Sequence, residues 1–349
     1  MKPSIFAVLI IAASLFASCK NDLELDGKYT KRVLSVNGYI NADSTLNRLL
    51  VAWTDRNHPI PINDATLQIT VNGQPRQTIG HSSDEEGNYL IDGKLNPGDH
   101  VRIDVTTADR SQHAYIEDIV PQPIEKIDEL KAEFVKNVRY IANNGMRSTA
   151  DMYKIALQFR DNARTDYYRL TTTIYQTIKR RKVYPWEPDP QEPYQYKEIP
   201  PSTDYVATED PVMMEGKVLT PNSDFDFANG GSIVNRYGIF NDLAFNGTDC
   251  RINIYQQLDM YTLPNEPESP LTYSVDLGIT LSSFTPTAYY YLKAMNMRRS
   301  SYYEDNNDLT GPIKMPSNVN GGTGIVGFYT SRNLPIHIYG PERYPGLYN

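Results

Sequence analysis

The sequence has no excess of basic residues. Its 34 Lys and Arg are outnumbered by 42 Asp and Glu, which gives a formal net charge of −8 at pH 7. Nucleic-acid-binding proteins carry a basic surface that faces the phosphates, and the one basic cluster here is the run Lys179-Arg180-Arg181-Lys182. The composition therefore argues against a nucleic-acid partner. We interpret the run as a solvated strand end, with partner binding as the alternative.

Motifs for catalysis and metal binding are also lacking. No Gly-x-Ser-x-Gly elbow is present, and the acidic segments 222–226 and 304–308 lack the glycine and closing glutamate of an EF-hand loop. No two histidines are close together or have zinc-type spacing; they are His58, His81, His100, His113 and His337. We interpret His337 as a structural residue within a strand. We therefore expect no metal, no cofactor and a non-catalytic function.

A long apolar run occurs at the N-terminus, from Ile5 to Phe16, after the positively charged start Met1-Lys2-Pro3. Small residues follow it, Ala17-Ser18, and the apolar run then stops at Cys19. A positive start, a short apolar core and a small-residue cleavage site are typical of a secretory signal peptide. A membrane-spanning helix needs about 20 apolar residues. We therefore predict a signal peptide over residues 1–18, with a retained anchor helix as the alternative.

The junction Leu15-Phe16-Ala17-Ser18-Cys19 resembles the lipobox of bacterial lipoproteins, in which the cysteine sulfur receives a diacylglycerol. Cys19 is accordingly the predicted lipid-attachment site, and residues 19–31 are predicted to form a lipidated tether. Several acyl chains together make a stable membrane anchor. The acidic stretch 21–26 resembles the export signal of Bacteroidetes lipoproteins. We expect a protein on the outer membrane that faces the cell exterior, with periplasmic retention as the alternative.

Cysteine is scarce, with 2 in the chain. If Cys19 is lipidated, only Cys250 remains, and no intramolecular disulfide can form. The fold must then be held by its apolar core, which is feasible at this length. We interpret Cys250 as a buried small hydrophobic residue rather than a nucleophile.

Tyrosine and proline are frequent: the chain has 26 Tyr and 24 Pro, against 10 Phe and 2 Trp. Tyrosine favours strands, and proline favours the loops between short strands. Over residues 32–122, short alternating segments are separated by turns, and Asn72-Gly73 is a strong hairpin signal. This pattern predicts an immunoglobulin-like or transthyretin-like antiparallel sandwich. The predicted strands lie at 33–40, 49–53, 66–71, 87–91 and 101–105.

Residues 123–349 predict a larger antiparallel β domain with one packed helix. Strands are predicted where Ile155, Leu157 and Phe159 alternate with polar residues, and at 167–175. Thr285 as N-cap and Pro286 at the first helical position predict a helix near 286–299. Its predicted core face carries Ala288, Tyr291, Leu292 and Met295. The glycine-rich segment 320–327 lacks the Lys-Ser/Thr pair of a phosphate-binding loop, so we interpret it as a turn that enters a strand.

The proline-rich segment 184–211 predicts a long loop, because proline is excluded from the interior of a sheet. Long loops in compact domains are often functional. We hypothesise that four aromatic residues on it contact a glycan or peptide ligand or a partner protein: Tyr184, Trp186, Tyr194 and Tyr196. The alternative is that these side chains fold back onto their own domain.

Several motifs occur in an order that resembles a known family. They are Pro97-Gly98, Asp166-Tyr167-Tyr168-Arg169-Leu170, Phe240-Asn241-Asp242, Phe245-Asn246-Gly247, Tyr289-Tyr290-Tyr291-Leu292 and residues 315–324. Together with the lipobox they look like the Bacteroidetes lipoproteins catalogued as domain of unknown function 4249, over nearly the whole mature chain.

Members of that family are typically encoded beside TonB-dependent outer-membrane receptors. The resemblance therefore implies an accessory role in nutrient capture or import, with such a receptor as the partner, and it implies no catalytic or ligand-binding residues. Two other functions stay open: an adhesive or structural surface protein, and a glycan-active enzyme that uses paired carboxylates.

Overall fold

The computed structural model describes residues 32–55, 58–83, 85–141, 147–179, 186, 194–207, 210–213, 235–258, 271–298 and 315–348. Cys19, Tyr184 and the acidic segments 222–226 and 304–308 lie outside these residues. Within the described part, none of the helical structure is both long enough and apolar enough to cross a membrane.

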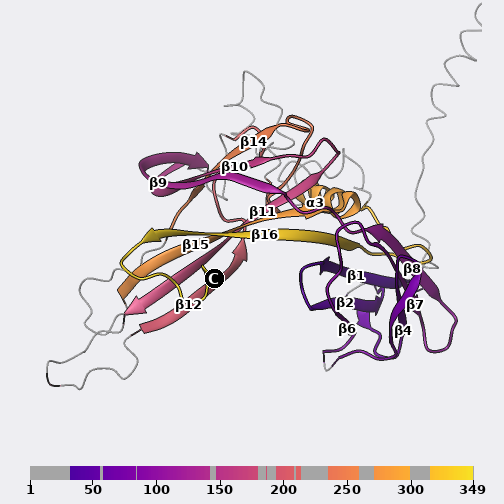
Figure 1. The fold of residues 1–349 in the computed structure, drawn as a ribbon. Coiled ribbons are helices and arrows are strands. Elements are labelled where there is room, and N and C mark those ends of the chain that lie inside the picture. Colours follow the sequence, from indigo (N-terminus) through magenta and orange to yellow (C-terminus); the bar gives the residue numbers. More distant parts are fainter. Residues whose placement is uncertain are drawn as a thin grey trace, which may run out of the picture. The chain divides into compact units, whose positions relative to one another are not determined.

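Strands dominate the described residues, and they form three sheets (Figure 1). The largest sheet has the order β12-β11-β15-β16-β1-β2-β3, with β13 paired to β11 and β6 paired to β2. Its strands are β1 (Leu34–Asn41), β2 (Leu46–Trp53), β3 (Ile60–Pro61), β6 (Asn88–Asp92), β11 (Tyr167–Lys179), β12 (Tyr194–Ser202), β13 (Ile239–Asn241), β15 (Leu271–Phe284) and β16 (Val326–Tyr339).

Two smaller sheets complete the fold. One has the order β5-β4-β7-β8 and the other the order β14-β10-β9. Their strands are β4 (Thr66–Val71), β5 (Gln74–Ile79), β7 (His100–Thr106), β8 (His113–Ile119), β9 (Lys126–Ile141), β10 (Arg147–Arg160) and β14 (Asp249–Gln256). The predicted mainly β fold is confirmed.

The four-stranded sheet packs against β1, β2 and β6 around one apolar core. Alternation along β7 buries Val101, Ile103 and Val105, which join this core. The predicted hairpin is also confirmed, because Asn72 and Gly73 both have positive φ, at 51° and 76°. Two residues with positive φ form the type I′ turn that suits the twist of a two-residue hairpin.

A strand near the end of the chain completes this sandwich. β16 pairs with β1 in parallel, with Gly38 opposite Val326. Just before β16, the glycine-rich segment 320–325 bridges both sheets, since Asn320 pairs with Tyr115 of β8 and Thr323 pairs with Ser35 of β1. The predicted turn entering a strand is therefore confirmed, and its role in closing the sandwich is an addition from the structure.

Glycine is required at position 324. Its φ is +116°, and a Cβ there would lie 2.1 Å from the carbonyl oxygen of Val36. We expect Gly324→Ala to lower the free energy of unfolding by about 1–3 kcal/mol or more, because the residue would be strained and β1 would have to move. Urea denaturation would measure the loss. Gly80→Ala is the control, since nothing lies within 4 Å of its Cβ position; equal effects at both sites would contradict the prediction.

The three-stranded sheet packs on the large sheet around a second core. Leu157 of β10 and Ile252 of β14 meet Leu277 of β15 there. Cys250 belongs to the same core, and burial raises the pKa of its thiol. The thiol therefore stays protonated, as expected of a buried structural cysteine.

The predicted helix is present as α3 (Pro286–Arg298). Thr285 precedes it, and its hydroxyl accepts a hydrogen bond from the amide of Phe328 in β16, at 3.3 Å. Ala288 and Leu292 are buried as predicted, and Tyr289 is buried as well. These residues form a small core with Phe284, so the helix packs on the sheet as predicted.

The prediction of a loop over 184–211 is wrong for residues 194–202, which form β12 at the edge of the large sheet. Proline is still absent from the sheet interior at this point, because Pro200 and Pro201 lie on a strand whose outer edge has no partner among the described strands. An edge strand tolerates a missing N–H on its outer side.

Candidate functional site

Alternation along the strands sends side chains to the two faces of the large sheet. Ile279 of β15 and Leu334 of β16 belong to the core beneath the three-stranded sheet. Tyr175, Asp276 and His337 form one row on the opposite face, because Asp276 pairs with Tyr175 on one side and with His337 on the other. Three residues that are far apart in the sequence are therefore neighbours.

The C-terminal segment 340–348, called the tail below, folds back over this face. The amide of Tyr344 donates to Asp276 Oδ2 at 2.8 Å, and the hydroxyl of Tyr348 donates to Asp276 Oδ1. The amide of Glu342 donates to the hydroxyl oxygen of Ser274 at 3.0 Å. The tail is thus hydrogen-bonded to β15, mainly through the carboxylate of Asp276, which has an exposed fraction of 0%.

His337 connects the carboxylate with the start of the tail. Its Nδ1 lies 2.8 Å from Asp276 Oδ1, and its Nε2 lies 2.7 Å from the carbonyl oxygen of Gly340. The ring therefore bridges the buried carboxylate of Asp276 and the backbone at Gly340. His337 lies in strand β16, as predicted, and its hydrogen bonds agree with a structural role.

Between the tail and the sheet lies a cavity of about 600 Å³. The sheet contributes three residues to its lining and the tail contributes the other five: Tyr175, Asn333, Pro335, Tyr344, Pro345, Gly346, Leu347 and Tyr348. No charged side chain is among these described residues. A cavity of this size is within the range that binds small ligands.

Three tyrosines are among the residues that line the cavity: Tyr175, Tyr344 and Tyr348. The rings of Tyr175 and Tyr344 lie 4.9 Å apart and are tilted by 54°. Tyr196 of β12 packs edge-on against Tyr344, with 5.6 Å between the ring centroids. Burial, and then the charge of Glu198, raises the pKa of the Tyr175 and Tyr344 hydroxyls. These phenols stay protonated at neutral pH and can donate hydrogen bonds.

The four aromatic residues proposed from the sequence have different positions. Tyr196 lies beside the cavity lining. The backbone of Tyr194 pairs with Lys179 at the start of β12, and Trp186 is 78% exposed. Tyr184 lies outside the described residues. The sequence reasoning missed Tyr175 and Tyr344, because only the sheet register and the folded tail bring them together.

A second polar cluster lies where β11 begins. The hydroxyl of Tyr168 donates to Asp161, and the amide of Gly247 donates to the other oxygen of Asp161 at 2.8 Å. The amide of Asp166 donates to Asp242 Oδ2 at 2.7 Å. Three of the motifs that suggested the family, 166–170, 240–242 and 245–247, therefore meet in space.

Asp242 is fully buried in this cluster. Asn246 donates to its Oδ2 at 3.1 Å, whereas its Oδ1 has no hydrogen-bond partner. Across the described residues, no group of three or more His, Cys, Asp or Glu side chains could hold a metal ion. We interpret the cluster as a structural tie between β11, β13 and the turn before β14.

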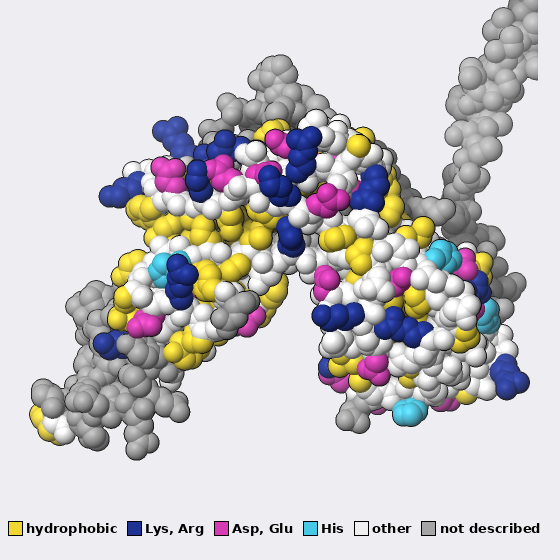
Figure 2. Space-filling view, viewed as in Figure 1, with side chains coloured by type: hydrophobic (Ala, Val, Ile, Leu, Met, Phe, Trp, Pro, Cys, Tyr) yellow, Lys and Arg dark blue, Asp and Glu magenta, His cyan; other side chains and the backbone are white. Residues whose placement is uncertain are grey.

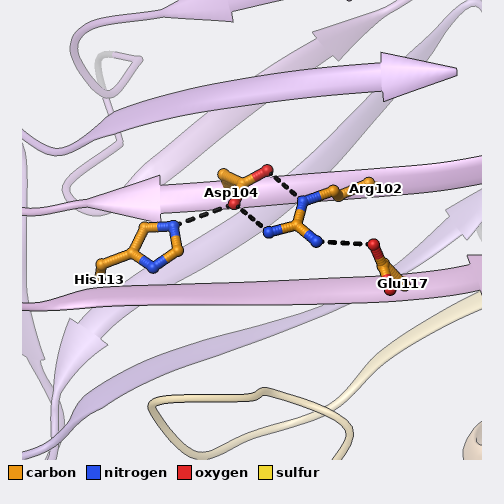
Figure 3. A network of polar contacts seen from close by, with 4 residues as sticks. All are labelled: Arg102, Asp104, His113 and Glu117. Atoms are coloured by element: carbon orange, nitrogen blue, oxygen red, sulfur yellow. Dashed lines mark hydrogen bonds and ion pairs between the residues drawn. The ribbon is translucent and has the colours of Figure 1, made fainter. Parts of the chain in front are cut away.

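A third polar group lies on the outer face of β7 and β8 (Figure 3). Arg102 donates to Asp104 and to Glu117, and His113 Nε2 lies 2.9 Å from Asp104. The hydrogen bonds from Arg102 lower the pKa of Asp104. Ion pairs this exposed contribute only about 0–1 kcal/mol, so we interpret the network as a solvated surface.

Acidic and basic side chains are interspersed on the face that Figure 2 shows, without a large region of one sign. This distribution agrees with the small charge imbalance of the sequence.

One comparison with known proteins gives a match. A family model described as domain of unknown function (DUF4249) matches residues 20–334. No curated protein matches the chain.

Proposed function

Because the chain belongs to the family described as domain of unknown function (DUF4249), we propose that it is a non-catalytic surface lipoprotein that assists TonB-dependent nutrient capture. In this proposal, Cys19 carries the lipid, the protein faces the cell exterior, and a TonB-dependent outer-membrane receptor is its partner. The lipobox-like junction and the acidic stretch after Cys19 support the location.

The cavity beneath the tail is the observation that supports ligand binding. It is concave and of suitable size, and the tail that forms one of its walls is hydrogen-bonded to Asp276 through Tyr344 and Tyr348. A glycan-active enzyme would need two carboxyl groups that face each other across the ligand. The described lining has neither Asp nor Glu, so we favour binding over catalysis at this site.

Membrane attachment is expected to depend on Cys19 alone. Cys19→Ala should move the protein from the membrane fraction to the soluble fraction, because the other cysteine is buried in a core. Cell fractionation and labelling with a clickable fatty acid would measure this. Cys250→Ala is the control and should keep its label. Continued labelling of the Cys19→Ala protein would contradict the assignment.

A detergent pull-down tests the accessory role. The tag is placed after Gly80, whose Cβ position is open, because the C-terminal residues line the cavity. We expect one outer-membrane receptor in near-equal amount, identified by mass spectrometry. Recovery of no receptor from intact outer membranes would contradict the role and favour an adhesive or structural surface protein.

A further inference from the structure

We infer that the cavity between the tail and β11, β15 and β16 binds a neutral sugar ring. The inference rests on the proposed function and deepens it, because it names the class of ligand that the protein captures. It is carried by the chemistry of the lining, the geometry of the tyrosine rings and the fixed position of the tail.

The lining indicates a ligand without charge. A phosphate or carboxylate group in a protein site is usually met by Arg, Lys or several N–H donors, and none of the eight described lining residues is charged. Asp276 lies beneath the cavity, but its two oxygens already accept bonds from Tyr344, Tyr348 and His337. The lining itself therefore supplies no charge for an ionic ligand, and the nearby charged residues Glu198 and Arg343 are not part of it.

The tyrosines indicate a ring with hydroxyl groups. Tyr175 and Tyr344 both line the cavity and their rings contact each other at a centroid distance of 4.9 Å, and the C–H faces of a pyranose can pack on aromatic rings. Tyrosine joins an apolar ring to a polar tip that seeks a hydrogen-bond partner. Asn333 adds an amide, whose oxygen lies 3.4 Å from the Thr280 hydroxyl. A purely apolar ligand would offer no partner to the Tyr344 hydroxyl or the Asn333 NH2 group, which costs free energy.

The tail makes this site a preformed one. Tyr344 and Tyr348 are held at their positions by Asp276 before any ligand arrives. Binding to a preorganised site avoids much of the entropic cost of ordering side chains and loops. A low entropic cost matters for ligands with several hydroxyl groups, because each hydroxyl group loses hydrogen bonds to water when the ligand binds.

The inference is tested with the full mature chain carrying Cys19→Ala, which makes it soluble without a lipid. The probes are methyl glycosides of glucose, galactose, mannose and N-acetylglucosamine, with methyl glucuronide as a charged probe. Saturation-transfer NMR detects binding and calorimetry measures the affinity. We expect at least one neutral glycoside to bind and the glucuronide to bind at least tenfold more weakly.

Variants locate the site. Tyr175→Ala should weaken binding of the neutral glycoside about tenfold, which corresponds to about 1.4 kcal/mol, and Tyr175→Phe should retain most of the stacking. Tyr290→Ala is the matched control, since this exposed tyrosine lies on α3 and not in the lining. Tyr175→Phe keeps the test valid if the alanine variant does not fold.

Three results would overturn the inference: no glycoside binds with a Kd below about 10 mM, the glucuronide binds as well as the neutral sugars, or Tyr175→Ala binds like the wild type. Failure here differs from failure of the accessory role. A receptor that co-purifies without any sugar binding refutes only the ligand class, whereas sugar binding without a receptor refutes only the partnership.

Discussion

Replacing Asp276 by alanine is expected to release the tail and to lower the free energy of unfolding by about 3–5 kcal/mol. Asp276 is the partner of three groups, and each buried polar group left without a partner costs about 1–3 kcal/mol. The variant leaves His337 without its carboxylate, and it also leaves the amide of Tyr344 without an acceptor. Urea denaturation gives the free energy, and hydrogen exchange at the Tyr344 amide reports on the tail.

Two further variants define this effect. Asp276→Asn keeps an oxygen for the Tyr344 amide and should cost less than Asp276→Ala, although its NH2 group then replaces the oxygen that faces His337 and the Tyr348 hydroxyl. Asp104→Ala removes a carboxylate from the exposed network and should cost no more than about 1 kcal/mol. The prediction is wrong if Asp276→Ala and Asp104→Ala destabilise the protein equally, or if the Tyr344 amide stays protected.

The second large effect is expected at Asp242. Asp242→Ala removes the acceptor for the amide of Asp166 and for the side chain of Asn246. Each buried donor left without a partner costs about 1–3 kcal/mol. Asp242→Asn should behave differently, because its oxygen can accept both bonds while its NH2 group replaces the unpartnered Oδ1. Thermal or urea denaturation at neutral pH should therefore place the alanine variant below the wild type and the asparagine variant at or above it.

The pH dependence of unfolding gives an independent test of this cluster. Burial, and then the neighbouring carboxylate Asp161, raises the pKa of Asp242, and burial also raises that of Asp166. A raised pKa means that the folded state holds the proton more tightly than the unfolded state. The stability from this proton is complete below the unfolded pKa of about 3.9, and it is lost as the pH rises through the folded pKa.

We therefore expect Asp242→Asn to reduce the decline in stability between about pH 4 and neutral pH. The comparison uses the free energy of unfolding of both proteins across this window. Parallel curves for the wild type and the variant would show that Asp242 does not titrate differently in the folded and unfolded states.

Local features of the fold could be predicted from the sequence because their causes are local. The Asn72-Gly73 turn requires positive φ at two positions, and the Asn-Gly dipeptide is typical of such a turn. The start of α3 follows from Thr285 and Pro286, and most strands follow from alternation of apolar residues. The strand β12 was missed because Pro200 and Pro201 suggest a loop, although they are compatible with a sheet edge.

Pairings between distant segments were not visible in the sequence. Nothing local indicates that Asp276 lies opposite His337, or that it accepts the amide of Tyr344. The candidate site consists of such pairings, which explains why, among the side chains that the structure describes, Tyr196 is the hypothesised contact residue beside the cavity. Tyr175 is ordinary in its strand and becomes notable only when the tail lies over it.

The closing of the N-terminal sandwich by β16 has a consequence for how the protein folds. The amide of Ile325 donates to the side chain of Asn37, a contact between residues 288 positions apart. Contacts between such distant residues slow folding, because a long loop must close before they form. The sandwich cannot be completed until β16 has been synthesised and pairs with β1. Before that, β1 has an unpaired edge that can join a strand of another chain, so refolding should be accompanied by aggregation unless a chaperone protects that edge.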